Sequence, residues 1–399
     1  MIDLLKDKRV FVTGGSGFVG GRLVEVLIRE CGAKVRALVH SHTGALRMAR
    51  FEVEFVLADM ADQTAMVKAT QDCEIIFHCA FGKGGSIKEQ WRATVEGTRA
   101  LALATLKNGV SRLINLSTAA VYGNTPDAEI DETFPRIPGP WHYAKMKLDA
   151  ELVLEELGRR EPLPFTTLQL TGVYGPWGEV FTIDPLRQLA TSRLVLVNNG
   201  TGFMNATYVD DAVQAILRAA LKPEAMRETF LIKGPGSVTR RQFYEAYSRM
   251  LGVDGLVGMT LGEIAAHRRH ASRQNLRRLF PSAARALRFD TVFRQAFSGS
   301  PAGGCFQFVR PWLPELVVSK LKGESVSRIQ TATVGPESRP LILPPEMMVR
   351  RLGAKTELSA RKAERLLGYK PAFELDRGMA LTEQWARWAR LIPECVAGA

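Results

Sequence analysis

Two residues one helical turn apart are the chain's clearest candidates for proton transfer. We expect the run 144–157 to be helical. Lys147 lies within it and Tyr143 directly precedes it, so their side chains should share one face. A free tyrosine titrates near pH ~10 and is a poor base at neutral pH, but a neighbouring cation favours its phenolate. The pair therefore predicts a general acid/base, although the same spacing also suits a solvated helix face.

Hydroxyl groups stand upstream, at the end of an apolar run. Residues 112–118 read RLINLST and predict a strand that ends in Ser117 and Thr118. Ligands in α/β folds bind outside the carboxyl ends of parallel strands. We therefore expect one of these two hydroxyls to lie beside Tyr143.

The N-terminal segment carries a glycine pattern of the kind that holds phosphates. Gly14, Gly17 and Gly20 lie between a predicted strand and a predicted helix, and a second strand follows. Glycines let the backbone turn sharply and let a pyrophosphate approach the helix N-terminus, whose N–H groups favour an anion. The context predicts a dinucleotide site, whereas the pattern alone would indicate only a tight turn.

The end of the second predicted strand bears on which dinucleotide binds. NAD enzymes usually keep an acidic residue there for the ribose 2′-hydroxyl. Here the sequence RALVHSHT offers Arg36, His40, Ser41 and His42 and no acid. A carboxylate would repel a 2′-phosphate, so its absence favours NADP over NAD, although the same residues also suit an ordinary exposed turn.

Asp59 closes the next predicted strand, in FEVEFVLADM. A carboxylate at this place can meet an adenine or ribose edge, or it can cap the helix that begins near Asp62. Strands continue to alternate with helices as far as residue 175, with a helix predicted over 88–108 and a single strand over 165–175. This alternation predicts a parallel, doubly wound sheet.

The composition is that of a globular protein with two or three folding units. The chain has 399 residues, of which 46% are apolar and 24% charged. It shows neither the ~20 apolar residues that cross a bilayer nor a signal-peptide pattern, so we expect a cytoplasmic protein. The cysteines have no metal-ligand or disulfide spacing, and we expect no metal site and five free thiols: Cys31, Cys73, Cys79, Cys305 and Cys395.

Positive charge is concentrated in one part of the chain. The net charge is +12, and residues 257–351 hold fifteen Lys and Arg against six Asp and Glu, which is nine of the twelve excess charges. Residues 261–280 and 282–297 show helical patterns with basic fringes. Three roles remain open for this region: a lid or subunit contact, the binding of an anionic substrate, or contact with a membrane surface. Nucleic acid is not expected, because aromatic residues do not alternate with the basic ones.

In order and spacing, these motifs resemble the extended short-chain dehydrogenase/reductase family, which includes nucleotide-sugar epimerases and dehydratases and 3β-hydroxysteroid dehydrogenases. The resemblance covers about residues 8–256 and 356–391. TGGSGFVG resembles the cofactor loop, LADM the adenine-contacting turn and FHCA the H-x-A strand. LSTAAVYG resembles the segment with the catalytic hydroxyl, YAKMKLDAE the Y-x-x-x-K pair, and VYGP the loop on the nicotinamide ribose.

The resemblance implies roles for individual residues. Counting back from Tyr122 in the family pattern selects Thr118 over Ser117 as the hydroxyl that bonds the substrate oxygen. Tyr143 is then the general acid/base, and Lys147 bonds the nicotinamide ribose and lowers the pKa of Tyr143. The implied cofactor contacts are Gly14, Ser16, Gly17, Phe18, Val19, Gly20, His40, Asp59, Met60, Cys79, Ala80, Tyr143, Lys147 and Val173.

The resemblance also implies the domain organisation. A Rossmann domain spans 1–174 and regains 205–234, a smaller substrate domain combines 175–204 and 235–392, and the basic helical insertion occupies 257–345. The insertion has no family counterpart. A homodimer is a further implication of the family.

Several departures from the family pattern bear on the substrate. Ala119 and Ala120 replace the acid pair that dehydratases use, which argues against dehydration. Asn205 stands where nucleotide-sugar enzymes often carry a phosphate-binding arginine, and Gln169 replaces another arginine. Thr94 replaces an asparagine, which puts a backbone or water contact in doubt. These changes weaken the case for a nucleoside-diphosphate sugar.

We therefore expect an NAD(P)-dependent oxidoreductase or epimerase that acts at a secondary alcohol or ketone of a fairly large small-molecule substrate, sterol-like or sugar-type. One alternative is a nucleotide-sugar 4-epimerase. Another, from a different class, is a non-catalytic NAD(P)-binding redox sensor or scaffold, against which the full set of Thr118, Tyr143 and Lys147 argues. The sequence does not separate epimerase from dehydrogenase.

Overall fold

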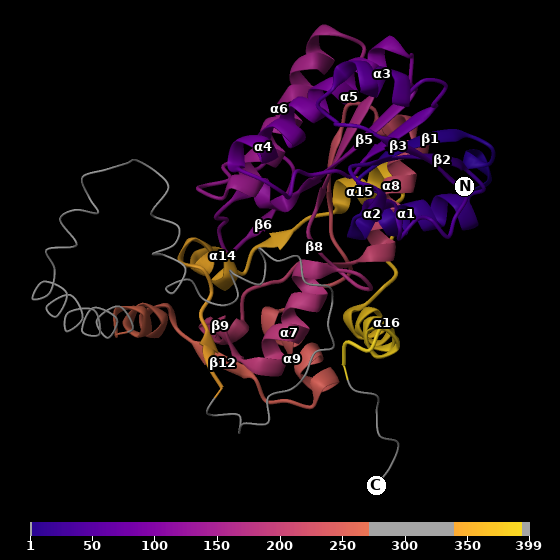
Figure 1. The fold of residues 1–399 in the computed structure, drawn as a ribbon. Helices are drawn as coiled ribbons and strands as arrows, with labels where there is room; N and C mark the ends of the chain where they lie inside the picture. The colour runs from indigo at the N-terminus through magenta and orange to yellow at the C-terminus, as the bar shows by residue number, and fades with distance from the viewer. Residues whose placement is uncertain (1, 271–338, 393–399) are drawn as a thin grey trace, which may run out of the picture.

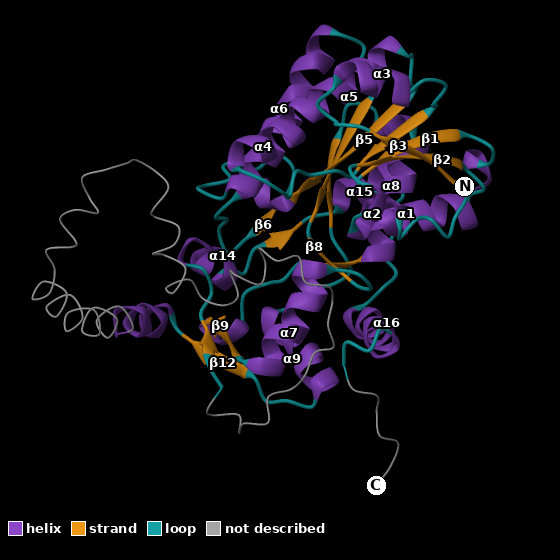
Figure 2. Cartoon of the chain, viewed as in Figure 1, coloured by secondary structure: helices purple, strands orange, loops and turns teal. Residues whose placement is uncertain are grey.

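A seven-stranded parallel sheet forms the centre of the computed structural model, which describes residues 2–270 and 339–392 (Figures 1 and 2). The strand order is β3-β2-β1-β4-β5-β7-β11. The order reverses between β1 and β4, and such a switch point is where doubly wound sheets bind ligands. The strands are β1 (Arg9–Thr13), β2 (Lys34–Val39), β3 (Val53–Leu57), β4 (Ile75–His78), β5 (Arg112–Thr118), β7 (Phe165–Leu170) and β11 (Thr229–Ile232).

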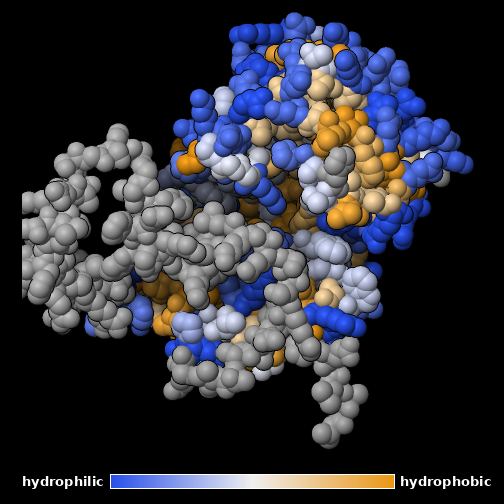
Figure 3. All heavy atoms as spheres, in the orientation of Figure 1, coloured by the Kyte–Doolittle hydropathy of each residue, from blue (hydrophilic) through white to orange (hydrophobic). Residues whose placement is uncertain are grey.

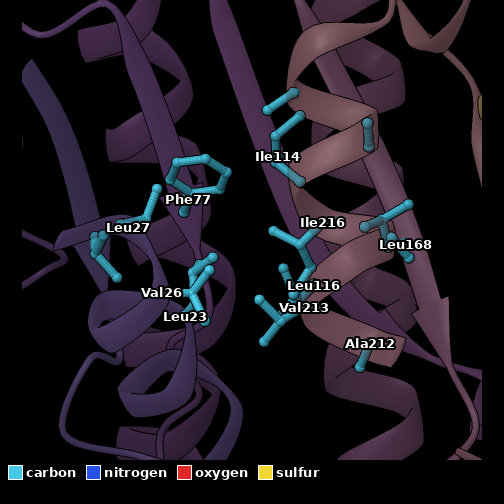
Figure 4. Close-up of a cluster of buried hydrophobic side chains, with 14 of the residues drawn as sticks. Leu23, Val26, Leu27, Phe77, Ile114, Leu116, Leu168, Ala212, Val213 and Ile216 are labelled. Atoms are coloured by element: carbon cyan, nitrogen blue, oxygen red, sulfur yellow. The ribbon is translucent and has the colours of Figure 1, made fainter. Parts of the chain in front are cut away.

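Helices cover both faces of this sheet, which confirms the predicted doubly wound α/β fold. One face carries α1 (Phe18–Arg29), α8 (Val209–Leu221) and α15 (Arg361–Leu367). The other carries α3 (Gln63–Ala69), α5 (Gly97–Lys107) and α6 (His142–Arg160). Figure 4 shows side chains of α1 and α8 beside those of the central strands. The middle strands are rich in apolar residues because both of their faces are buried.

A smaller unit lies below the sheet in Figure 1 and has its own hydrophobic core. Its three parallel strands run in the order β12-β9-β13. Its elements are α7 (Asp184–Thr191), β9 (Arg193–Val197), α9 (Arg240–Leu251), β12 (Leu256–Met259), β13 (Leu341–Ile342), α14 (Val349–Gly353) and α16 (Leu375–Trp388).

Two short strand pairs connect distant parts of the sequence. β8 (Gly172–Tyr174) pairs with β10 (Ala206–Tyr208), and β6 (Glu129–Ile130) pairs with β14 (Glu357–Leu358). The single strand that the sequence predicts over 165–175 is therefore wrong. It divides at Thr171 into β7 and β8, which belong to different sheets.

The predicted helix 88–108 also differs in detail. A π-helical turn (Arg92–Glu96) separates α4 (Ile87–Trp91) from α5. Such turns recur at functional sites. Residues 261–270 are helical, as predicted, but the rest of the predicted basic helices falls outside the described residues. Within 2–270 and 339–392, no helix is long and apolar enough to span a membrane.

Candidate active site

The predicted site residues gather at one edge of the main sheet. Gly14 follows β1, His40 follows β2, Cys79 follows β4, and Thr118 ends β5. Asp59 lies beyond the end of β3. Because all these strands are parallel and adjacent, their carboxyl ends meet at the same edge.

The glycine loop packs too closely against neighbouring backbone to accept side chains at two of its positions. Gly14 has a φ of +69°, and a β-carbon there would lie 2.7 Å from the backbone nitrogen of Ala80. A β-carbon on Gly20 would collide with the carbonyl oxygen of Gly14. Helix α1 begins after Gly17 without a side-chain cap. Its first N–H groups are therefore available to an anion.

Arg47, which lies beyond β2 in the chain, contacts this loop, and the sequence reasoning missed it. Its Nη1 donates to the carbonyl oxygen of Gly17 over 2.6 Å, and its Cζ lies 5.1 Å from the ring centroid of Trp177. Burial lowers the pKa of Arg47 to about 10. No spacing pattern in the sequence connects Arg47 with the glycines, so only the fold brings it there.

The other predicted cofactor contacts differ in what they expose. Ser16 and His40 are exposed and offer their side chains to solvent. The remaining apolar contacts pack against the hydrophobic cores, so backbone groups are the main ones that they offer: Phe18, Val19, Met60, Cys79 and Val173.

Asp59 has protein partners of its own. Arg92 donates to its carboxylate over 2.7 Å, and the backbone N–H of Ala61 donates over 2.9 Å. The alternative that Asp59 caps the following helix is wrong, because Asp62 caps α3 through the N–H of Ala65. The adenine-side role of Asp59 stays a prediction.

Arg36 does not face the cofactor edge in the way that the NADP argument assumed. Its Nε lies 2.8 Å from Glu54, and its Nη1 donates to the carbonyl oxygens of Ala69 and Gln71. Through these contacts the Arg36 guanidinium connects β2 with Glu54 and with the end of α3. Arg36 therefore no longer supports the choice of NADP. The remaining argument for NADP is that no acidic residue directly follows β2.

Tyr143 stands in the first turn of α6 with its ring between two aromatic residues. The ring centroids of Phe81 and Trp141 lie 4.8 Å and 5.3 Å away. Burial raises the pKa of Tyr143, while the neighbouring Thr118 side chain and the positive charge of Arg351 lower it.

Lys147 lies one turn further along α6 and is buried. Its Nζ donates to the carbonyl oxygen of Leu116 over 2.9 Å and to that of Ala80 over 3.3 Å. Burial lowers the pKa of Lys147 to about 8. The expected lowering of the Tyr143 pKa by Lys147 is not what the structure shows, because Arg351 is the cation that acts on the phenol.

Ser117 bonds a residue about two turns further along α6 than Tyr143 and belongs to a buried polar cluster there. Its hydroxyl donates to Glu151, which also accepts from Arg136 over 2.8 Å and from Gln169 over 2.9 Å. We call this cluster the rear network: Ser117, Tyr122, Arg136, Glu151, Glu155 and Gln169. The arrangement leaves Thr118 as the hydroxyl on the side of Tyr143.

Two arginines of the smaller unit lie near each other, Arg240 at the start of α9 and Arg351 in α14. We call them the front arginines. The Cζ of Arg351 lies 5.6 Å from the ring centroid of Trp141, and the Nη1 of Arg240 lies 3.3 Å from the sulfur of Met204. Burial lowers the pKa of both, that of Arg351 to about 10. Neither forms an ion pair with another described residue. Sequence reasoning missed them, because they are far apart in the chain.

A small pocket opens beside Arg351. Figure 3 shows hydrophobic residues in the recess between the sheet and the smaller unit. The pocket is lined by small, apolar and aromatic residues with one cation: Gly123, Asn124, Pro138, Gly139, Pro140, Trp141, Met347, Met348 and Arg351.

Two of the family departures have structural explanations. Asn205 has a φ of +47°; its amide donates to the carbonyl oxygen of Thr356 over 2.9 Å and accepts from the N–H of Leu358 over 3.0 Å. Both ends of this amide therefore hold backbone. Thr94 accepts from the N–H of Gly82 over 3.1 Å, so it supplies a backbone contact of the kind that had been in doubt.

Comparison with known proteins assigns the class to which this fold and site belong. The model of the NAD dependent epimerase/dehydratase family matches residues 10–232, and the chain belongs to that family. This agrees with the resemblance to extended short-chain dehydrogenases. The chain is similar to a UDP-glucose 4-epimerase from Thermotoga maritima, with a TM-score of 0.64 and 22% identity over 96% of this chain and 99% of that one.

Particular relatives have different activities. A ketoreductase of 4-hydroxy-2-methyl-3-oxo-4-farnesyl-3,4-dihydroquinoline-1-oxide from Stigmatella aurantiaca is 28% identical over 70% of this chain and 84% of its own length. A 3beta-hydroxysteroid-dehydrogenase/decarboxylase from Arabidopsis thaliana is 31% identical over 51% of this chain and half of its own. A mouse dTDP-D-glucose 4,6-dehydratase is 26% identical over 54% and 66%. Dehydratases thus stand among the relatives, and the comparisons give no support to excluding dehydration.

Proposed function

We propose that this protein is an NAD(P)-dependent oxidoreductase that interconverts a secondary alcohol and a ketone on a large, mainly apolar substrate. The observation that carries the proposal is the pairing of Tyr143 with Thr118 at the sheet edge where the glycine loop opens. In this proposal residues 1–174 and 205–234 hold the cofactor, and 175–204 and 235–392 hold the substrate.

The chain's own residues would handle the proton. During oxidation the phenolate of Tyr143 accepts the proton of the substrate hydroxyl, and during reduction the phenol returns it. Thr118 donates a hydrogen bond to the same oxygen and fixes its direction. The bound dinucleotide supplies the hydride acceptor or donor. Lys147 has two of its three N–H groups on carbonyl oxygens, which leaves the third for a ribose hydroxyl.

Two features of the structure fit a dinucleotide. The glycine loop would collide with any β-carbon at Gly14 or Gly20, and the uncapped start of α1 offers N–H groups to a pyrophosphate. Arg47 contacts this loop from a later segment of the chain and would add a positive charge. We favour NADP over NAD because no acid directly follows β2, where the exposed His40 and the half-buried Ser41 stand instead.

The surroundings of Tyr143 support an apolar substrate. Phe81 and Trp141 flank its ring, and the neighbouring pocket contains Met347 and Met348. The relatives named for a farnesylated ketone and for a hydroxysteroid act on substrates of this kind. A nucleotide-sugar 4-epimerase is less well supported, because the amide of Asn205 is already hydrogen-bonded to backbone groups and is not available to a phosphate.

Ala119 and Ala120 argue against dehydration, because alanine cannot carry the proton that the loss of water requires. A non-catalytic role is also less well supported, since a scaffold has no evident need for a phenol and a hydroxyl at one point. Both statements rest on the residues themselves and not on the relatives.

The decisive experiment compares the wild-type chain with Tyr143→Phe. Hydride transfer is followed by the absorbance of the reduced nicotinamide, with NAD and with NADP, on a panel of hydroxysteroids, 3-hydroxy acids and UDP-sugars. We expect the variant to lose roughly 10²- to 10⁴-fold in rate, because a positioned acid/base contributes that much, and to bind cofactor as tightly as wild type by calorimetry. Equal rates in the two proteins, or no hydride transfer on any member of the panel, would overturn the proposal.

A further inference from the structure

The two positive charges of the front arginines form no ion pair with any acid among the described residues. Arg240 is held by the Met204 sulfur, and its Nε is buried without a hydrogen-bond partner. Arg351 has no hydrogen bond or ion pair among the described residues and rests on the face of Trp141. Removing a guanidinium from water is unfavourable unless an anion compensates for it. A site with two such groups is therefore built for an anion that comes from outside the described fold.

The backbone around these arginines is fixed by hydrogen bonds. The N–H of Arg240, at the start of α9, donates to the carbonyl oxygen of Gly202 over 2.8 Å. The N–H of Phe203 donates to the carbonyl oxygen of Ala354, just beyond α14, over 3.0 Å. Residues 202–203 thus hold both arginine-bearing segments side by side, and the positive charge of Arg240 acts on Arg351.

The same two charges lie close to the reacting group. Trp141 is the link, because its ring centroid lies 5.3 Å from that of Tyr143 and 5.6 Å from the Cζ of Arg351. The positive charge of Arg351 acts on the Tyr143 phenol. An anion held here is therefore near the oxygen that Tyr143 and Thr118 would bond.

We propose that Arg240 and Arg351 bind a carboxylate that the substrate carries a few bonds from the carbon with the reacting oxygen. This deepens the proposed function and rests on it for the position of that oxygen. Guanidinium groups bind carboxylates in a bidentate manner. The substrate class is then a hydroxy or keto acid with an apolar body, which the aromatic and methionine side chains of the pocket would contact.

A single carboxylate fits this site better than a diphosphate. The site has aromatic and thioether walls and two cations, and the nearby amide of Asn205 is occupied by the backbone of Thr356 and Leu358. A diphosphate would bring more negative charge than two arginines and the one neutral amide of the pocket, that of Asn124, would compensate.

Calorimetry on the full chain with cofactor tests this directly. The probes are 3-hydroxydodecanoic acid, its methyl ester and UDP. We expect wild type to bind the acid roughly ten- to a hundredfold tighter than the ester, the range for hydrogen bonds to charged groups. Arg351→Gln and Arg240→Gln should lose this preference while keeping their affinity for the ester. The neighbours supply matched controls, because Arg350→Gln changes an exposed residue and Arg241→Gln one that pairs with Glu245. Both controls should keep the preference.

Three results would overturn the proposal. One is the absence of a preference for the acid in wild type, including no binding of either probe. Another is an unchanged preference in both front variants. The third is tighter binding of UDP than of the acid, with loss of UDP binding in Arg351→Gln. Melting temperatures of all variants show whether each is folded. Selective binding of the acid without hydride transfer would refute the proposed function and leave the anion site standing, so the two failures are distinguishable.

Discussion

Two groups of charged residues near the site, the rear network and the front arginines, differ in whether each charge has a partner. In the rear network each charge has one: Arg136 bonds Glu155 through two N–H groups and Glu151 through one. Arg240 and Arg351 have no acid as a partner among the described residues. Charges paired inside a protein hold its structure, whereas unpaired and desolvated ones mark a site for a ligand. The comparison separates the residues that hold the site in place from those that would bind the ligand.

The largest loss of stability is expected from a change in the rear network. Glu151→Ala would leave the Ser117 hydroxyl and the Gln169 amide without their buried partner, although Arg136 would keep Glu155. We expect the free energy of unfolding to fall by about 3 kcal/mol, measured by urea denaturation. Because α6 carries Tyr143, the rate of hydride transfer should fall as well.

Glu151→Gln is the matched control for this change. Its amide oxygen can still accept from Ser117, but its NH2 group cannot accept and would face the N–H donors of Arg136 and Gln169. We expect a loss of about 1–2 kcal/mol, smaller than that of the alanine variant. If the glutamine variant is as unstable as the alanine variant, the rear network depends on the charge itself and not on the hydrogen bonds.

A smaller effect is expected from a front residue whose groups are satisfied. Asn205→Ala would remove the two bonds to the backbone of Thr356 and Leu358, and alanine is disfavoured at a positive φ. We expect a loss of about 1–2 kcal/mol in the free energy of unfolding, with the preference for the acid probe over its ester unchanged. If that preference disappears, Asn205 belongs to the anion site and the division between satisfied and unsatisfied front groups is wrong.

The cofactor side of the site could be predicted well from the sequence, and the reason is local. Gly14, Gly17 and Gly20 lie in one strand-turn-helix segment, and Tyr143 and Lys147 share one helix, so period and spacing alone bring them together. The parallel order of the strands followed from the alternation of strand and helix patterns. The break at Thr171 was missed, because an apolar run does not reveal where a strand leaves one sheet for another.

The substrate side could not be predicted, because long-range packing creates it. Arg240 and Arg351 are separated by more than a hundred positions in the sequence and meet only through residues 202–203. The charge on Arg36 was misjudged for the same reason, since its partner Glu54 belongs to the neighbouring strand β3. A residue's type shows what it can bind, but only the fold shows whether another group has already bound it.

The pH dependence of turnover tests which cation controls Tyr143. Arg351 lowers the pKa of the phenol, so Arg351→Gln should raise it. Oxidation needs the phenolate, and the acidic limb of kcat/KM against pH should therefore move to higher pH in this variant. Reduction needs the phenol, so its basic limb should move in the same direction. Arg350→Gln should leave both limbs in place. If the limb belonged instead to Lys147, whose pKa is about 8, Arg351→Gln would not move it, because the charges that act on Lys147 are those of Cys79 and Glu151. An unmoved limb would therefore assign the titration to the amine of Lys147 and not to the phenol of Tyr143. The front arginines would then have no control over proton transfer.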